Sequence, residues 1–251
     1  MPRTWVPEVW ATAARPYNVS MCGRFTLRNP HLLQRELFQL ADIPALPARF
    51  NIAPTQQIAA IRQLPDQPRR ELALLHWGLI PSWAKDPKIG NTLINGRSET
   101  AATKPAFRSA FKSRRCLIPA DGFYEWQRTP DGKRPYYIHR RDGQPFAFAG
   151  LWDRWHNPDD GATESATILT TSPNDLMRPI HDRMPVILPA DEYTKWLDPE
   201  VKDAKLLEPL LKPCDPADWE ATGVSTYVNT PRHDDERCIS PVETTTQTKL
   251  F

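Results

Sequence analysis

The sequence predicts a single α+β domain with antiparallel sheets in a barrel-like core and short helices at the periphery. Three observations predict this class. The 27 prolines among 251 residues limit the length of every element and argue against a helical bundle. Short apolar or alternating runs, several of them bounded by turn sequences, dominate the middle of the chain. Segments with helical periodicity are fewer and lie around these runs.

The strand-like segments follow one another closely. A proline-rich turn, Leu64-Pro65-Asp66-Gln67-Pro68, separates two of them. The turns Pro130-Asp131-Gly132 and Asp142-Gly143 predict hairpins that join three strands. The predicted strands are 24–27, 57–64, 72–80, 116–118, 123–127, 136–139, 146–152, 166–171 and 185–188.

Four helices are predicted. The first begins where Asn29 supplies an N-cap and Pro30 a first-turn proline, and it extends to about Ala41. Its leucines at 33, 37 and 40 fall on one face. The others cover 105–114, a segment that begins at Asp191 and carries Trp196, and 204–211.

Composition restricts the class of function. The chain has 32 basic and 30 acidic residues, so any nucleic-acid surface must be a local patch. The cysteines at 22, 116, 214 and 238 have no metal-ligand spacing and suggest no disulfide framework. Together with the lack of a secretory signal or membrane-span-like run, they predict a reducing, cytoplasmic setting without a metal or organic cofactor.

The two ends of the chain differ from the middle. Residues 1–20 show no coherent helical or alternating pattern, so we expect an extension that is not part of the mature protein. From Thr230 onward the chain becomes polar, which predicts a mobile C-terminal tail over 230–251. The domain itself is then expected to cover 21–229.

Met21-Cys22 is the most informative pair, because Met21 is a candidate second start codon. Removal of this methionine would leave Cys22 with a free α-amine beside its thiol. Such a 1,2-aminothiol condenses with an aldehyde: the amine forms an imine, and the thiolate then closes a thiazolidine ring. An amide nitrogen cannot form an imine, so this chemistry depends on where the mature chain begins. The alternative is an ordinary N-terminal arm ahead of a buried cysteine.

Four further segments place reactive side chains where a strand meets a loop. Each also has a structural interpretation when taken alone. Glu125 could face solvent on an edge strand, His181 could be satisfied by Asp182, and Asn95 could be a plain turn residue. Two tryptophans could simply be packing residues. The segments are Trp77–Ala84, Asn95–Thr100, Asp121–Trp126 and Ile180–Pro185.

Taken together, these segments resemble one family, the SOS-response-associated peptidases, or SRAP proteins, which act on abasic sites in single-stranded DNA. The matching pieces occur in family order from about residue 21 to residue 190, which is most of the chain. They are Met21-Cys22-Gly23-Arg24-Phe25, Asn51-Ile52-Ala53-Pro54-Thr55, Trp77-Gly78-Leu79-Ile80-Pro81, Asn95-Gly96-Arg97-Ser98-Glu99-Thr100, Gly122-Phe123-Tyr124-Glu125-Trp126 and His181-Asp182-Arg183-Met184-Pro185.

The resemblance implies four catalytic residues. Cys22, as the first residue of the mature protein, would supply the amine and thiol for a thiazolidine link to the deoxyribose aldehyde. Asn95 would orient the amine and polarise the reacting centre. Glu125 would shuttle protons during sugar-ring opening and imine formation, and its aromatic neighbours predict a raised pKa. His181 would hydrogen-bond the opened sugar and assist as acid or base.

The resemblance also implies contacts with single-stranded DNA. Arg24 and Arg97 would grip phosphates that flank the lesion, since the guanidinium fork donates two parallel hydrogen bonds. Trp77 and Trp83 would offer apolar surfaces for stacking or for wedging at a kinked strand. A role in the DNA-damage response and an association with the nucleoid follow from the same resemblance.

The upstream residues depart from the family pattern, because members begin at the methionine before the cysteine. Either Met21 is the true start, which the patternless extension favours, or the chain is cut between Met21 and Cys22. The peptidase name of the family reflects proposed self-removal of preceding residues. In that reaction Cys22 would be the nucleophile, with Glu125 and His181 as the acid–base pair.

Other functions remain open at this stage. Cys22 and His181 would also suit a cysteine peptidase or amidohydrolase. The tryptophans and arginines would also suit a non-covalent single-strand-binding module. A later abasic-site lyase activity would be compatible with crosslinking, since an imine at C1′ permits β-elimination.

The last five residues carry a separate signal. Gln247, Leu250 and Phe251 form a Gln-x-x-Leu-Phe ending that resembles peptides bound by the bacterial sliding clamp. An exposed apolar pair is costly unless a partner buries it. The alternative is that Leu250 and Phe251 fold back onto the core.

Overall fold

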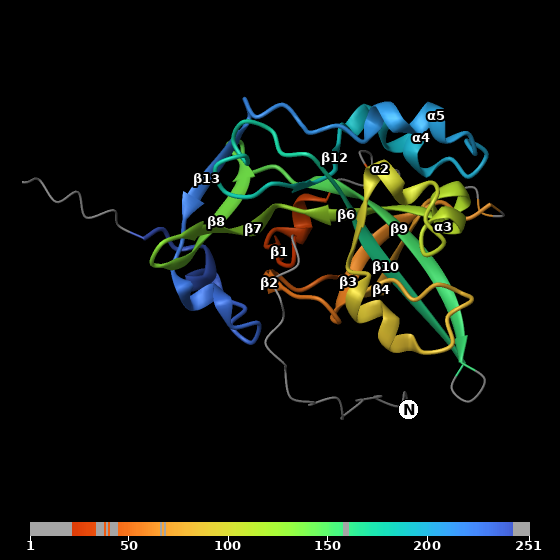
Figure 1. Ribbon diagram of the computed structural model, residues 1–251, viewed down its shortest axis with the longest axis horizontal. Coiled ribbons are helices and arrows are strands. Elements are labelled where there is room, and N and C mark those ends of the chain that lie inside the picture. The colour runs from red at the N-terminus through yellow and green to blue at the C-terminus, as the bar shows by residue number, and fades with distance from the viewer. Residues whose placement is uncertain are drawn as a thin grey trace, which may run out of the picture.

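Two sheets that share an apolar core, with short helices around them, make up the fold of the computed structural model (Figure 1). The structure describes residues 22–33, 38, 40, 45–65, 67, 69–157 and 161–242. The predicted fold class is confirmed: a predominantly sheet α+β domain with a barrel-like core and peripheral helices.

Five strands close into a barrel. β10 (Gly161–Thr171) pairs with both β4 (Glu71–Trp77) and β9 (Phe146–Asn157), and the ring is completed by β3 (Gln57–Arg62) and β6 (Arg115–Ala120). Four of the contacts are antiparallel and the β4–β10 contact is parallel. All six residues of β6 are buried, as expected for a strand with the core on one side and helices on the other.

Three short strands extend the barrel sheet. β5 (Asn95–Arg97) runs parallel to β10. β11 (Met184–Pro185) pairs with β10, and β12 (Ile187–Leu188) pairs with β9. β5 was not predicted, because three residues are too few to show a strand period.

The second sheet has five strands in the order β13-β8-β7-β1-β2. It packs on the barrel through Phe25, whose ring centroid lies 5.2 Å from that of Trp77 and 5.8 Å from that of Phe148. The strands are β1 (Phe25–Leu27), β2 (Arg49–Ile52), β7 (Gly122–Thr129), β8 (Gly132–Arg140) and β13 (Trp219–Gly223). β2 and β13 were not predicted from the sequence.

One of the two predicted hairpins is present. The turn Pro130-Asp131-Gly132 joins β7 to β8, and Thr129 pairs with Gly132. The prediction for Asp142-Gly143 is wrong, since β8 belongs to the second sheet and β9 to the barrel. The turn itself is present: Gly143 has a φ of 67° and Asp142 accepts the backbone N–H of Gln144. A turn sequence fixes a local change of direction but does not choose the partner strand.

The helices are short and lie outside the sheets. α3 (Arg108–Ser113), α4 (Tyr193–Leu197) and α5 (Ala204–Leu207) fall within predicted segments, whereas α2 (Ser98–Ala101) was not predicted. The helix predicted over 29–41 begins as η1 (Pro30–Leu32), and much of its remainder lies outside the described residues. No helix within the described ranges is long and apolar enough to cross a membrane. The other 3₁₀ turns are η2 (Pro87–Thr92), η3 (Ala190–Glu192), η4 (Glu208–Leu210), η5 (Thr226–Asn229) and η6 (Glu236–Ile239).

The predicted boundary of a mobile tail at Thr230 is wrong for residues 230–242. Asp234 accepts the backbone N–H groups of Phe50 and Asn51 at 2.5 and 2.8 Å. The Asn51 amide donates to the carbonyl oxygens of Thr230 and His233, at 3.1 and 2.7 Å. Polar contacts therefore hold residues 230–242 to β2. The hydropathy of the sequence does not predict such contacts. Residues 243–251, including the candidate clamp-binding ending, lie outside the described residues.

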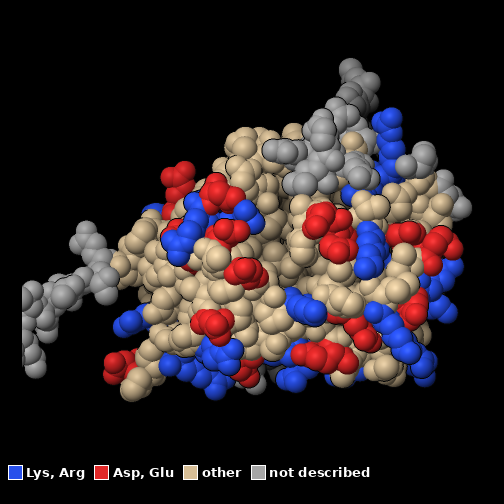
Figure 2. All heavy atoms as spheres, turned by 90° about the horizontal axis from the view of Figure 1, so that it is seen from above, with Lys and Arg blue, Asp and Glu red and all other residues tan. Residues whose placement is uncertain are grey.

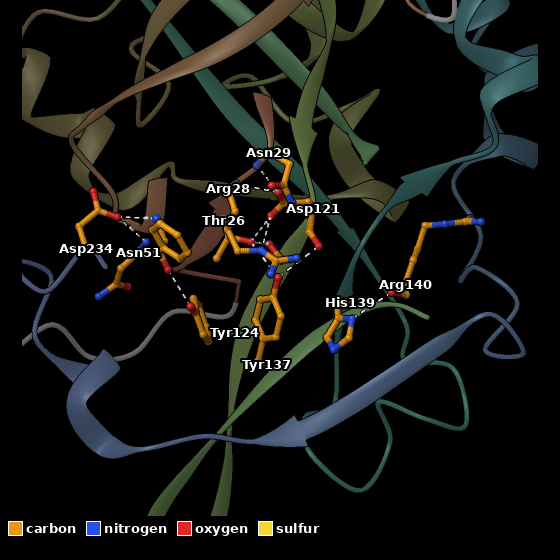
Figure 3. A network of polar contacts seen from close by, with 12 residues as sticks. Thr26, Arg28, Asn29, Asn51, Asp121, Tyr124, Tyr137, His139, Arg140 and Asp234 are labelled. Atoms are coloured by element: carbon orange, nitrogen blue, oxygen red, sulfur yellow. Dashed lines mark hydrogen bonds and ion pairs between the residues drawn. The ribbon is translucent and has the colours of Figure 1, made fainter. Parts of the chain in front are cut away.

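A buried carboxylate fixes β1 against β7 (Figure 3). Asp121 is 1% exposed and accepts hydrogen bonds from the Thr26 hydroxyl at 2.6 Å and from the backbone N–H groups of Arg28 and Asn29 at 2.7 and 2.9 Å. Buried carboxylates are stable only when hydrogen-bonded in this way. This contact sets the register that places the residues just before β1 beside β7.

We expect Gly122→Ala to destabilise the protein by about 1–3 kcal/mol, the usual cost of overpacking a core. A Cβ at Gly122 would lie 2.2 Å from the Tyr137 hydroxyl and 2.3 Å from its ring, and Tyr137 is buried. Gly223→Ala is the matched control, since a Cβ there meets nothing within 4 Å. Urea unfolding of both variants tests the expectation, and equal midpoints would contradict it.

Candidate functional site

Cys22 and Glu125 lie in contact in the interior. The backbone nitrogen of Cys22 donates a hydrogen bond of 2.6 Å to Oε1 of Glu125, and both residues are buried. The pairing of β1 with β7 explains the contact. Phe25 is opposite Phe123, and the Tyr124 N–H donates to the Arg24 carbonyl at 3.0 Å. The chain before Phe25 therefore passes Glu125.

Burial controls the protonation of this pair. Burial raises the pKa of Glu125 to about 8, although the N–H groups of Cys22 and Trp126 oppose the shift. A raised pKa of Glu125 is also what the sequence predicted. Burial, together with the nearby Glu125 carboxyl, also raises the pKa of the Cys22 thiol well above its usual value. Near neutral pH, Glu125 therefore carries a proton that it can donate, and Cys22 is a thiol.

Asn95 contacts Cys22, and His181 lies near Asn95, since both line one pocket. Asn95 is on β5, and its side-chain nitrogen lies 3.5 Å from the carbonyl oxygen of Cys22. His181 is in the loop before β11, where burial lowers its pKa. Asp182 opposes this shift, and the nearby Arg128 and Lys133 add to it. The imidazole is therefore neutral near pH 7. The structure thus brings all four predicted catalytic residues to one region.

A pocket of about 810 Å³ lies beside these residues and is lined by Asn95, Arg97, Trp126 and His181, among others. Cys22 and Glu125 do not line it. They adjoin it through Asn95, which reaches the Cys22 carbonyl, and through Trp126, the neighbour of Glu125 on β7. The pocket therefore adjoins the buried pair without exposing it.

The predicted DNA-binding residues lie in different environments. Arg97 is exposed and lines the pocket. Arg24 donates to Asn51 Oδ1 at 3.1 Å and to the Val228 carbonyl at 3.0 Å, so it also ties β2 to η5. Trp83 is 57% exposed, and its indole N–H donates to the Pro105 carbonyl at 3.3 Å.

Trp77 cannot act as a stacking surface, so this part of the prediction is wrong. It is 0% exposed, and its indole N–H donates to the Ile94 carbonyl at 3.0 Å. Trp77 ends β4 with its ring in the core, against Phe25. The alternative interpretation of this tryptophan, core packing, is correct.

Sequence reasoning missed two basic residues at the pocket, Arg128 and Arg178. With Arg97 they give the pocket three arginines, against Asp182 as its acidic lining residue. Figure 2 shows one face of the molecule, on which basic and acidic side chains are interspersed. Arg128 could have been found from strand alternation, because it follows Trp126 by two residues on β7. No sequence signal marks Arg178.

In the part of the chain that the structure describes, no group of three or more histidine, cysteine, aspartate or glutamate side chains is arranged to hold a metal ion.

The fold and this site define a member of one family. The chain matches the family described as SOS response associated peptidase (SRAP) over residues 21–231, and it belongs to that family. It is 44% identical to the abasic site processing protein YoqW of Bacillus subtilis over 223 residues, which cover 87% of this chain and 99% of YoqW. It is 37% identical to the abasic site processing protein HMCES of Xenopus tropicalis over 200 residues, 70% of this chain and 59% of HMCES. A crystal structure of a protein from Bacteroides thetaiotaomicron superposes with a TM-score of 0.77 at 28% identity and covers 88% of this chain and 100% of that one.

Proposed function

We propose that this protein processes abasic sites in single-stranded DNA by linking them covalently to Cys22 through a thiazolidine. The observation that carries the proposal is the 2.6 Å contact between the Cys22 nitrogen and the buried Glu125 carboxyl. Membership of the family, and the names of YoqW and HMCES, support the substrate class. The setting proposed for this activity is the cytoplasm, in association with the nucleoid.

The proposed reaction begins with the sugar. An abasic deoxyribose is mostly a closed hemiacetal, so a proton must be moved before the aldehyde is exposed. Glu125 is the acid–base group for this step, and a positioned group of this kind typically gives ~10² to 10⁴-fold.

The bond-forming steps then need only Cys22. Its amine adds to the aldehyde carbon and water leaves, which gives the imine. The sulfur adds to the same carbon, and the thiol proton passes to the nitrogen, which gives the thiazolidine. One water molecule is released overall, and no oxidant or reductant is needed. Asn95 would hold the Cys22 backbone, and His181 would hydrogen-bond the opened sugar.

We propose that single-stranded DNA binds at the pocket. Arg97, Arg128 and Arg178 supply positive charge for backbone phosphates. Trp83 does not line the pocket, but it would supply an exposed ring for stacking or wedging. Because phosphate contacts release counterions, salt should weaken the encounter complex but not the covalent product.

Self-removal of the upstream residues is a second proposed activity, and the same contact favours it. The Cys22 nitrogen that touches Glu125 is the leaving nitrogen of the Met21–Cys22 bond. The Cys22 sulfur would attack the Met21 carbonyl carbon, and Glu125 would protonate the nitrogen as the amide bond breaks. Water would then hydrolyse the thioester and return the thiol. Translation from Met21, followed by methionine removal, leads to the same mature end.

The proposal is tested by a denaturing gel with an abasic and an undamaged single-stranded oligonucleotide. We expect a slow-migrating product with the abasic strand only, and none with Cys22→Ala. A complex that disappears on denaturation would instead indicate the non-covalent binding module. Hydrolysis of peptides or amides by protein that retains residues 1–21 would indicate the cysteine hydrolase. Cleavage of the abasic strand would reveal the lyase activity.

We expect deletion of residues 247–251 to abolish capture of a bacterial sliding clamp without changing the crosslinking rate. Leu250 and Phe251 are the apolar residues that the clamp pocket would bury. Substitution of Lys249 by Ala is the matched control, since this residue occupies a variable position of the Gln-x-x-Leu-Phe pattern. Clamp binding by the deletion variant, measured by pull-down with purified clamp, would contradict the role of the tail.

A further inference from the structure

The Arg183 side chain joins elements from both sides of the site. Its two terminal nitrogens contact the two carboxylate oxygens of Glu99, with Nη2 to Oε2 at 2.8 Å. Nη2 also donates to the Thr170 carbonyl at 2.6 Å. Arg183 is 8% exposed, so the fork is largely shielded from water. A bidentate pair of this kind fixes direction as well as distance.

These contacts tie the loop that carries His181 to the strand that carries Asn95. Glu99 is on α2, directly after β5, and Arg183 directly precedes β11. β10 lies between them, because Thr170 pairs with Arg97 on one side and with Pro185 on the other. The Glu99–Arg183 pair therefore sets the position of the Arg183 backbone relative to β5.

The Arg183 backbone in turn contacts the imidazole. Its N–H donates to Nδ1 of His181 at 3.2 Å. A backbone N–H can only donate, so Nδ1 must accept and carries no proton. The neutral ring then bears its proton on Nε2. Asp182 opposes this arrangement, because its Oδ1 lies 2.9 Å from the same Nδ1 and would favour a proton there.

We infer that Glu99 and Arg183 are positioning residues that select the His181 tautomer with the proton on Nε2. The Glu99 carboxylate binds the Arg183 guanidinium, and this contact positions the Arg183 backbone. The Arg183 backbone N–H then donates to Nδ1 of His181, where Asp182 would otherwise favour a proton. The catalytic meaning of this selection rests on the proposed function: an Nε2–H group is the donor that His181 offers to the opened sugar.

The tautomer is measured by imidazole ¹⁵N–¹H NMR on the whole chain with ¹⁵N-labelled histidine. There are six histidines, and a His181→Gln variant assigns the signal. We expect the Nε2–H form in the wild type and a shift toward Nδ1–H in Glu99→Gln and in Arg183→Lys. Asp182→Asn added to Glu99→Gln should restore the Nε2–H form. Because the Glu99 side chain is half-exposed, we expect Glu99→Gln to fold. This variant therefore tests the inference even if Arg183→Lys does not fold.

An unchanged Nε2–H signal in Glu99→Gln, with a dispersed amide spectrum, would overturn the inference, as would an Nδ1–H signal in the wild type. Crosslinking is a separate readout. We expect Glu99→Gln to slow it by about 10-fold, part of the ~10² to 10⁴ that an acid–base group supplies, with DNA affinity unchanged. A changed tautomer with an unchanged crosslinking rate would support the inference and count against the proposed role of His181.

Discussion

Protein translated from Met21 should form a denaturation-resistant complex with abasic single-stranded DNA, whereas protein that keeps residues 1–21 should form none. The reason is chemical: the nitrogen that contacts Glu125 is an amide in the longer chain and an amine after removal of Met21. An amide nitrogen has no basic lone pair for addition to an aldehyde. The expected difference is therefore all or none, and intact mass must show which end each preparation carries.

A Cys22→Ser variant in the Met21-started protein separates the roles of nitrogen and sulfur. It keeps the amine and loses the thiol, so we expect an imine that borohydride traps but no stable product without the reductant. Robust crosslinking by protein whose mass includes residues 1–21 would contradict the account. If the wild-type and variant products were equally stable, the Cys22 sulfur would not take part in the crosslink.

Glu125→Gln should slow crosslinking by ~10² to 10⁴-fold and leave the affinity for DNA unchanged. Glutamine preserves the size of the side chain and its acceptor oxygen for the Cys22 nitrogen, but it cannot exchange a proton. Glu125 does not line the DNA pocket, so the encounter complex should survive. Single-turnover crosslinking and a separate binding titration measure the two effects. Equal rates for the variant and the wild type would exclude Glu125 from the mechanism.

The same variant should change the pH dependence of stability in the unprocessed chain. Glu125 has a folded-state pKa of about 8, above the ~4.3 of an unfolded glutamate. Between these values the folded protein binds a proton that the unfolded chain lacks, so stability falls as pH rises through that window. Glu125→Gln removes the dependence. Unfolding free energies of the two proteins at pH 5 and pH 8 measure the difference.

The fold could be predicted to the level of class because apolar alternation and proline spacing act locally. Most barrel strands were found in this way. Strand partners could not be predicted: the Asp142-Gly143 turn leads from one sheet to the other, and β10 pairs with β4 in parallel. Both outcomes depend on contacts between segments far apart in sequence, which no local pattern encodes.

The residues of the candidate site could be predicted from their motifs. Their burial and their contacts could not. Glu125 lies between aromatic residues in the sequence, but strand neighbours point to the opposite face, and its contact with Cys22 joins segments far apart in the sequence. Trp77 was misassigned because strand alternation does not say which face of β4 meets the second sheet. Arg178 and the Asp234 contacts with β2 carry no sequence signal, because each depends on loop geometry.

The bond to Cys22 is tested most directly by mass spectrometry of the crosslinked protein after nuclease and trypsin digestion. Trypsin cuts after Arg24, so the account predicts a Cys22-Gly23-Arg24 peptide that carries the sugar remnant and has neither a primary amine nor a free thiol. A sugar remnant on a lysine, on Cys116, or on a peptide that still includes Met21 would contradict it.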